Sequence, residues 1–166
     1  MEYLAKGKRS KVYLTTINNK KFVKKISKEF NIENEVKWLK ILNKHKIGPK
    51  LISYDSNSIT EEFLDGERID IFLKKAKLNE IKTIFKNILN QCYKMDKLNV
   101  NKFELTNPYK HIIIKNLKPV MIDFERCRFS LKPKNVSQFI EFILRTKIFN
   151  TDKENKIRKL VKEYKN

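Results

Sequence analysis

Residues 119–129 read PVMIDFERCRF, and the rest of the chain is best understood from this stretch outward. The apolar run 120–122 predicts a buried strand. Asp123 follows at the end of that strand, where a rigid backbone would hold its carboxylate facing a cleft. A carboxylate in this position is either a metal ligand or a capped structural acid, and the surrounding segments decide between the two.

A second apolar run, 112–114, precedes this strand and is separated from it by a short polar turn. The two runs predict an antiparallel hairpin. His111 stands immediately before the first strand and Asp123 immediately after the second, so we expect the two side chains to be neighbours. A single histidine at the start of a strand can also be purely structural.

The first part of the chain is rich in strands. Alternating and β-branched residues predict strands over 3–5, 11–16 and 21–26, and a hairpin over 50–54 and 58–63. An apolar stripe with helical spacing predicts a helix over about 32–43. The fold class expected from this order is α+β, with an antiparallel sheet.

One lysine and one glutamate of this part are expected to form an ion pair. Strand alternation places Lys24 on one face with Phe22 and Ile26, and Lys25 on the opposite face, where its removal should have little effect. Glu35 lies within the apolar stripe of the following helix, where a carboxylate is costly unless it is paired. We therefore predict a pair between Lys24 and Glu35. The alternative is that the stripe is rotated and Glu35 lies at its edge.

The second part of the chain is rich in helices. Helices are predicted over 79–95, with Cys92 in the core, over 135–147, and from a capping box at 151–154 onward. A glycine turn after residue 62 resembles a hinge. The expected division is 1–64, strands plus one helix, and 65–166, mainly helices, which together make one domain.

The net charge is strongly positive. The 166 residues include 38 lysines and arginines against 19 acids, which gives +19. Such a charge favours polyanions: nucleic acid, nucleotide phosphates or an acidic partner. A lysine-rich proteome with solvated lysines is an equally simple explanation.

Other classes of protein are disfavoured by the composition. No run approaches the roughly 18 apolar residues of a membrane span, and no signal-type segment follows Met1. We expect a cytoplasmic protein with no membrane partner. Cys92 and Cys127 lack metal-site spacing, so a zinc cluster is not predicted.

The ordered set of segments resembles the protein kinases, in the compact form of small atypical kinases and of kinase-like partners in tRNA modification. Phe22-Val23-Lys24 resembles the strand motif that ends in the phosphate-binding lysine, and Glu35 resembles its helical partner. The segment 62–66 resembles the hinge that holds adenine through Glu62 and Leu64. The place of the glycine-rich loop is taken by Lys6, Gly7, Lys8, Arg9, Ser10, Lys11 and Val12.

The catalytic and metal positions of that family are matched less closely. Glu104 stands in the place of the catalytic aspartate and would orient or deprotonate an acceptor hydroxyl. Asp123 occupies the metal-binding position, with His111 in place of the usual asparagine and Glu125 in place of a glycine. Only ten residues, 125–134, precede the next predicted helix, so the long activation segment of ordinary protein kinases is missing.

The resemblance implies a two-lobed protein kinase-like fold, with an antiparallel-sheet N-lobe over 1–64 and a reduced helical C-lobe over 65–166. It implies an ATP-dependent, serine/threonine kinase-like phosphotransferase that moves the γ-phosphate to a hydroxyl with Mg²⁺ or Mn²⁺. The acceptor would be a protein or an RNA-associated molecule. Two alternatives stay open: a pseudokinase or ATPase that acts as a regulatory subunit, and a basic nucleic-acid-binding module on such a scaffold.

Overall fold

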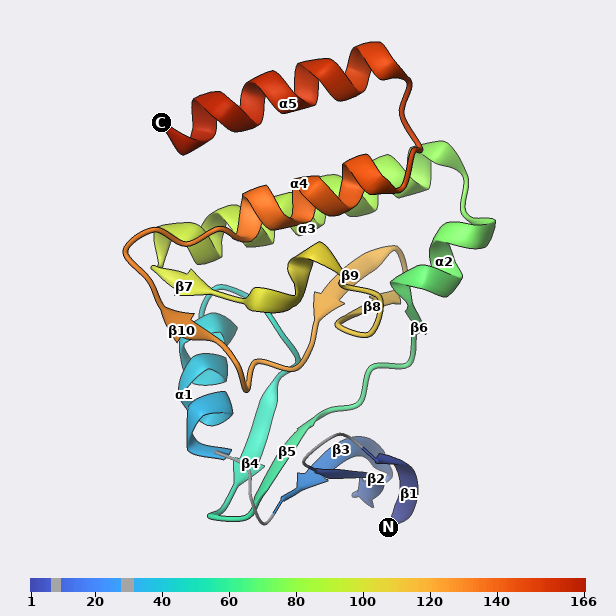
Figure 1. The fold of residues 1–166 in the computed structure, drawn as a ribbon. Helices are drawn as coiled ribbons and strands as arrows, with labels where there is room; N and C mark the ends of the chain where they lie inside the picture. The colour runs from blue at the N-terminus through green and yellow to red at the C-terminus, as the bar shows by residue number, and fades with distance from the viewer. Residues whose placement is uncertain (7–9, 28–31) are drawn as a thin grey trace.

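The computed structural model describes residues 1–6, 10–27 and 32–166, and it is an α+β fold of antiparallel sheets and helices (Figure 1). The described strands are β1 (Glu2–Lys6), β2 (Lys11–Ile17), β3 (Lys20–Ile26), β4 (Leu51–Tyr54), β5 (Ser58–Glu62), β6 (Glu67–Arg68), β7 (Val100–Asn101), β8 (Ile112–Lys115), β9 (Lys118–Met121) and β10 (Arg128–Phe129). The described helices are α1 (Ile32–Asn43), α2 (Ile69–Lys75), α3 (Leu78–Lys97), the short 3₁₀ helix η1 (Phe103–Thr106), α4 (Asn135–Arg145) and α5 (Thr151–Lys165). The predicted α+β class is confirmed.

Strands β1 to β5 form one sheet in the order β1-β2-β3-β5-β4, and α1 packs against β4 and β5. The pairing of β3 with its two neighbours sets which side chains share a face: Lys25 lies opposite Val12 of β2, and Val23 lies opposite Glu61 of β5. Because side chains alternate along a strand, Val23, Lys25 and these two partners project from the same face. The candidate site is built on that face.

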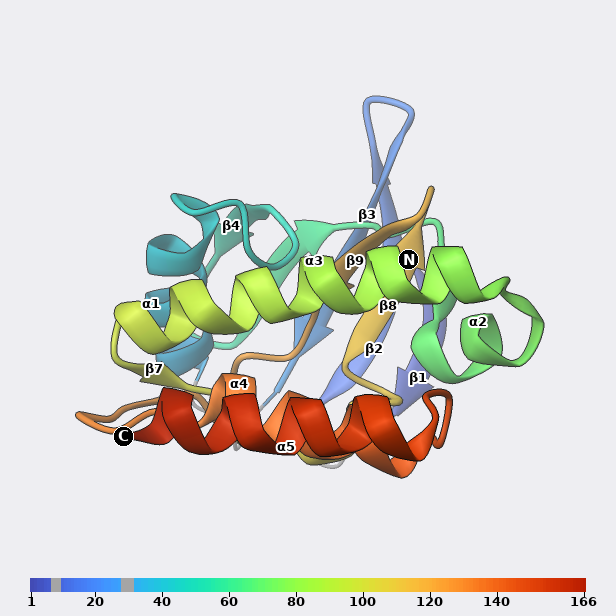
Figure 2. The ribbon, with the colours of Figure 1, turned by 90° about the horizontal axis from the view of Figure 1, so that it is seen from above.

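Helices α3, α4 and α5 lie along one another at the opposite end of the molecule from the five-stranded sheet (Figures 1 and 2). The small sheets β6-β8-β9 and β10-β7 lie between these helices and the large sheet. The inward face of α3 is the one that its sequence predicts, with Ile81, Ile84, Phe85, Ile88, Cys92 and Met95 buried. Within the described ranges, no helix is both long enough and apolar enough to cross a bilayer.

The last helix begins as predicted at residue 151 but is capped differently. The side chain of Asn150 accepts a hydrogen bond of 3.1 Å from the backbone N–H of Lys153, so Asn150 is the N-cap in place of the expected capping box that starts at Thr151. At the other end of α5, Tyr164 donates a 2.8 Å hydrogen bond to Asp96 of α3. The first bond caps the N-terminus of the helix, and the second ties its C-terminal end to α3.

The connection from β5 to β6 runs through Gly66 and joins the large sheet to the helical part. A Cβ atom at Gly66 would lie 2.4 Å from the carbonyl oxygen of Ile114 in β8. Only a residue without a side chain allows this approach, so the glycine predicted in a hinge-like turn is required by its contact with β8.

Candidate functional site

A cavity of about 380 Å³ lies between the large sheet and the β8-β9 hairpin. Val12 and Val23 form apolar walls on the sheet side, and Ile113 and Ile122 form them on the hairpin side. The remaining described lining residues are Ser10, Lys25, Glu35, Pro49, Glu61, Glu62, Phe63, Leu64, Asp123 and Glu125. One lysine and five carboxylates thus face a space between two apolar surfaces.

Lys25 is held by two buried acids. Its Nζ lies 2.8 Å from Glu35 Oε1 and 3.3 Å from Glu61 Oε2. The side chains of Glu35 and Glu61 are 1% and 4% exposed, and that of Lys25 is 16% exposed, so Lys25 is the most accessible member of the group. Buried acids require such a partner, because desolvation of an unpaired carboxylate is strongly unfavourable.

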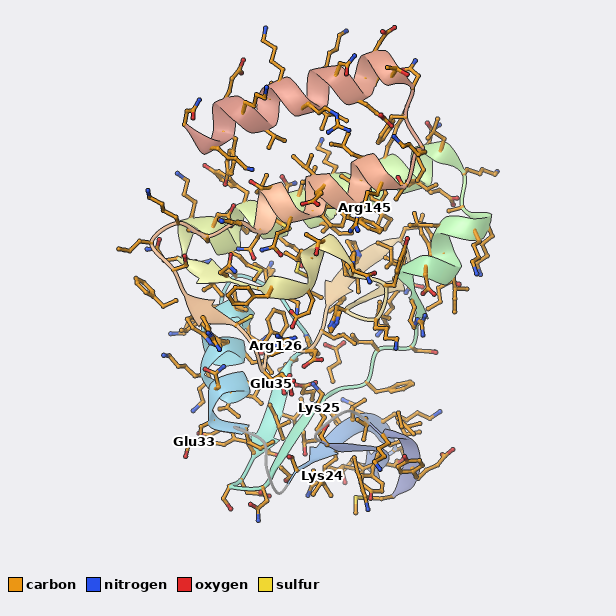
Figure 3. All side chains as sticks on the ribbon, viewed as in Figure 1. Lys24, Lys25, Glu33, Glu35, Arg126 and Arg145 are labelled. Carbon is orange, nitrogen blue, oxygen red and sulfur yellow. The ribbon has the colours of Figure 1, made fainter. Side chains whose placement is uncertain are left out.

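The predicted pair between Lys24 and Glu35 is wrong, because the partner of Glu35 is Lys25. Figure 3 shows Lys25 directed from β3 toward Glu35 and Lys24 on the other side of the strand. Two adjacent lysines fit the motif equally well in sequence. The sheet face is decided by the cross-strand neighbours Val12 and Glu61, which the alternation within β3 alone does not identify. Because Lys25, and not Lys24, has the buried acids as partners, replacement of Lys25 is expected to have the larger effect.

The two acids and the lysine change one another's protonation. Burial lowers the pKa of Lys25, but the attraction of Glu35, Glu61 and Asp123 outweighs burial and holds that pKa well above its ordinary value. Burial raises the pKa of Glu61 to about 7, against the pull of Lys25 and with the help of Glu35. Lys25 is therefore charged at neutral pH, and Glu61 titrates near it.

Helix α1 is bonded directly to the segment that follows β9. Glu35 Oε1 accepts a hydrogen bond of 3.2 Å from the backbone N–H of Phe124, in addition to its bond with Lys25. Asp123 has a φ of +67°, a conformation that residues other than glycine rarely adopt. One glutamate thus connects the lysine of the sheet to the backbone next to Asp123.

His111 and Asp123 are neighbours, as the hairpin predicts. The backbone N–H of Ile122 donates to the His111 carbonyl at 2.9 Å, and His111 Nδ1 lies 3.7 Å from Asp123 Oδ2. Burial, and then the charge of Lys102, lower the pKa of His111, so the imidazole is neutral at pH 7. Among the described residues, Nδ1 is buried without a hydrogen-bond partner.

The three residues expected as metal ligands do not form a single cluster. Asp123 and Glu125 line the cavity, whereas His111 is not among the described lining residues. In the described part of the chain, no group of three histidine, cysteine or acidic side chains is close enough to hold a metal ion. The assignment of His111, Asp123 and Glu125 as metal ligands stays a prediction, and of the three only the two carboxylates are among the described residues that line the cavity.

Glu104 lies on η1, beside a buried lysine. Lys102 is fully buried, and its Nζ donates a hydrogen bond to the carbonyl oxygen of Asp123 and lies 3.5 Å from Glu104 Oε2. Arg126 Nη1 lies 3.8 Å from Glu104 Oε1. Cations on two sides therefore hold this carboxylate next to the backbone of Asp123.

Only some of the residues expected to contact the phosphates and the base line the cavity. Ser10 and Val12 line the cavity, as do Glu62 at the end of β5 and Leu64 in the connection to β6. Lys6 and Lys11 pair with each other across β1 and β2 and are exposed, and neither is among the described lining residues. Gly7, Lys8 and Arg9 lie outside the described residues.

Two residues of the site were not anticipated from the sequence. The sequence marks Glu61 only as a strand residue, although two consecutive glutamates in one strand point to opposite faces, so that one of them faces inward. Lys102 carries no sequence signal that separates it from other lysines, because its burial depends on the position of Asp123, 21 residues later.

No protein-family model matches the chain, and no curated protein matches it. Any functional assignment therefore depends on the geometry described above.

Proposed function

We propose that the chain is an ATP-dependent phosphotransferase with a two-lobed, protein kinase-like fold, and that its nucleotide binds in the cavity between the large sheet and the β8-β9 hairpin. The observation that carries the proposal is the ion pair between Lys25 and Glu35 next to Asp123. A strand lysine, a helical glutamate and an aspartate after a later strand are the residue set that protein kinases use for phosphoryl transfer.

The apolar part of the cavity suits a planar base. Val12 and Val23 lie on one side and Ile113 and Ile122 on the other. Stacking of a base between such side chains removes apolar area from water, and hydrogen bonds from backbone groups at the edge of the cavity would fix the orientation of the base. In this proposal the segment from Glu62 to Leu64 supplies that edge.

The polar part of the cavity suits phosphates that arrive with a divalent cation. Only one cation, Lys25, lies among the described lining residues, against the carboxylates of Glu35, Glu61, Glu62, Asp123 and Glu125. A free triphosphate would be repelled by these acids. Mg²⁺ binds through one or two carboxylates together with substrate phosphates, so the oxygens of Asp123 and Glu125 fit this ion. The bound cation would neutralise charge on the phosphates.

Lys25 is suited to hold a phosphate because its position is fixed before binding. Glu35 and Glu61 keep its amine charged and restrict its side chain, while its partial exposure leaves donors for a ligand. Phosphoryl transfer depends mainly on such positioning and on charge neutralisation. In the proposal Glu104, held by Lys102 and Arg126, orients or deprotonates the acceptor hydroxyl.

The test compares two adjacent lysines. Binding of ATP with Mg²⁺ or Mn²⁺ is measured by calorimetry, and transfer is measured with γ-labelled ATP, for Lys25→Ala and Lys24→Ala. Lys25→Ala should weaken binding or turnover by about 100-fold or more, since it removes a charge-assisted contact, and Lys24→Ala should change either by less than about threefold. Equal effects of the two substitutions, or no ATP binding by the wild-type chain, would refute the proposal.

A second candidate function is a nucleotide-binding regulatory protein without transfer activity. The observation that favours it is that both oxygens of Glu104 already face cations of the protein, Lys102 Nζ at 3.5 Å and Arg126 Nη1 at 3.8 Å, so the carboxylate is engaged before an acceptor arrives. ATP binding that depends on Lys25, without label transfer to the chain or to added acceptors, would select this candidate. Label transfer that is lost in Glu104→Gln would select the phosphotransferase.

A further inference from the structure

The segment that follows the candidate site carries positive charge without nearby opposing charge in the sequence. Arg126, Arg128, Lys132 and Lys134 occur in this segment, and no acidic residue occurs between Glu125 and Glu141. All four cations are exposed. The charge of this part of the surface therefore exceeds what the average composition of the chain would give.

Two neighbouring elements extend the same surface. Lys97 at the end of α3 and Lys165 at the end of α5 line a hollow of about 720 Å³ together with Lys132 and Lys134. Figures 1 and 2 place the loop between β10 and α4 beside the C-terminal end of α5. The cations thus come from three elements that meet at one place.

The single acid among the described residues of that hollow is Asp96, and its oxygens are used internally. They accept hydrogen bonds from the backbone N–H groups of Asn135 and Val136, from the Asn135 side chain at 2.7 Å, and from Tyr164 at 2.8 Å. The Asp96 carboxylate is therefore engaged with protein donors, and the lysines around it stay available to a ligand.

Exposed aromatic and apolar side chains occur in the same segment and on η1, next to Arg128. Phe129 is 62% exposed and Leu131 is 81% exposed. The guanidinium of Arg128 lies 5.9 Å from the centre of the Phe103 ring, which is itself 46% exposed. Aromatic rings and guanidinium planes are the groups on which unpaired bases stack. The side chains of an acidic peptide have no aromatic face that would stack on them.

The backbone of this segment is fixed by hydrogen bonds. The N–H of Ser130 donates to the Asn99 carbonyl at 2.9 Å, and the N–H of Lys134 donates to Asn101 Oδ1 at 2.7 Å. β10 is also paired with β7. A surface held in one conformation loses less entropy on binding than a mobile loop does.

From these observations we infer that Phe103, Arg126, Arg128, Phe129, Lys132 and Lys134, with Lys97 and Lys165, form a binding surface for single-stranded RNA. The cations contact phosphates, and the rings of Phe103 and Phe129 stack on bases. Because Arg126 also contacts Glu104, a strand on this surface would lead toward the candidate site. RNA binding stands without the proposed function, and only the use of that RNA as a phosphate acceptor rests on it.

The experiment measures binding of fluorescent 15-nucleotide RNA to the full chain without ATP, from about 50 to 200 mM salt, the range over which phosphate contacts are most visible. The surface variant is Arg128→Ala with Lys132→Ala and Lys134→Ala. The matched control removes three exposed lysines elsewhere, Lys20, Lys44 and Lys118, by the same change to alanine.

The surface variant should bind RNA at least about tenfold more weakly than the wild type. The slope of log affinity against log salt should fall by roughly two to three, about one for each lost phosphate contact. The control triple should change affinity less than about threefold, since it alters only the general charge. Phe129→Ala should weaken binding about tenfold with an unchanged salt slope, and Phe129→Tyr should restore it, because stacking depends on the ring.

Three results would overturn the inference. The first is no RNA binding by the wild-type chain at the lowest salt, and the second is an equal loss of affinity in the surface and control triples. The third is that a polyglutamate peptide of equal charge binds as tightly as RNA and that its affinity is unchanged by Phe129→Ala. The last result would identify an acidic protein as the partner. RNA binding is measured without nucleotide, so absence of ATP binding by the wild-type chain would refute the proposed function alone and absence of RNA binding would refute this inference alone, which makes the two failures distinguishable.

Discussion

The side-chain amide of Asn34 donates a hydrogen bond of 2.6 Å to the carbonyl oxygen of Glu125. The same Nδ2 also lies 3.2 Å from the carbonyl of Cys127, and the neighbouring Glu35 accepts from Phe124 N–H. The first turn of α1 is thus hydrogen-bonded to the backbone of residues 124–127, which directly follow Asp123. The position of Asp123 relative to Lys25 therefore depends on α1.

Asn34→Ala should destabilise the protein by about 1–3 kcal/mol, because two partly buried carbonyl groups lose their donor. Asn34→Asp should cost at least as much, since a carboxylate keeps the shape of the amide but cannot donate when ionised. Denaturant unfolding measures both changes. Amide hydrogen exchange should also become faster in residues 124–127, because that segment loses its connection to α1.

Glu33→Gln is the matched control, because Glu33 is exposed on the same turn of α1. Its unfolding free energy should stay within about 0.5 kcal/mol of the wild type. If Asn34→Ala leaves both stability and exchange of residues 124–127 unchanged, the bonds from Asn34 do not hold the Asp123 segment.

Glu61 should make the stability of the protein depend on pH. Its pKa is about 7 in the folded state, above the ordinary value of 4.5, so the folded state holds this proton more tightly than the unfolded state does. The associated stabilisation is present below the unfolded pKa and is lost as pH rises through 7. Between pH 5 and pH 8 the loss from this group should be about 2 kcal/mol.

Glu61→Gln isolates this contribution, because glutamine keeps the shape and cannot ionise. The difference in unfolding free energy between wild type and Glu61→Gln, measured from pH 5 to 8, should shift in favour of the variant as pH rises. Glu163, which is exposed on α5, is the control, and Glu163→Gln should change the unfolding free energy by less than about 0.5 kcal/mol at each pH. A flat difference for Glu61→Gln would mean that its carboxyl titrates at its ordinary pH.

Most of the architecture follows from patterns that are local in the sequence. The apolar spacing of α3 identified its buried residues, and the hairpin of β8 and β9 placed His111 beside Asp123. Both inferences need only neighbouring residues and the geometry of one helix or one hairpin. The buried position of Glu35 was likewise visible in the stripe of α1.

The parts of the site that were missed depend on contacts between distant segments. Lys24 and Lys25 are chemically equal in sequence, and β5 decides between them by placing Glu61 on one face of the sheet. Lys102 is buried because it reaches the Asp123 carbonyl. Local periodicity does not contain this information, so the residue types of the site were found more reliably than its pairings.

Gly48 should not tolerate a side chain. Its φ is +81°, and a Cβ atom there would lie 2.8 Å from Cε2 of Phe124 and 3.0 Å from Cδ2 of Leu39. Gly48→Ala should therefore destabilise the protein by about 1–3 kcal/mol through both backbone strain and overpacking, as measured by thermal or denaturant unfolding. Phe124 is fully buried next to Asp123, so the loss should be accompanied by changes at the site.

A second substitution separates the two contributions at Gly48. Phe124→Leu shortens the side chain that the new methyl group would meet, so Gly48→Ala should cost less in a Phe124→Leu background than in the wild type. Equal costs in the two backgrounds would mean that the contact with Phe124 does not contribute to the loss.

Removal of the Lys102 amine should be among the most damaging single changes in the chain. Lys102 is completely buried, donates to the Asp123 carbonyl and faces Glu104, and its Nζ lies 4.8 Å from the centre of the Phe124 ring. Lys102→Met keeps most of the side-chain volume, but it removes the buried donor of the Asp123 carbonyl and leaves Glu104 with the more distant, exposed Arg126 as its described cationic neighbour. The expected loss is about 3–5 kcal/mol in denaturant unfolding. Glu104→Gln in addition should recover part of the lost stability, since the buried charge is then removed with its partner.

Lys94, an exposed lysine on α3, provides the control: Lys94→Met should stay within about 0.5 kcal/mol of the wild type. A loss for Lys102→Met no larger than that of Lys94→Met, or no recovery in the double variant, would show that the lysine does not stabilise Glu104 and the Asp123 backbone.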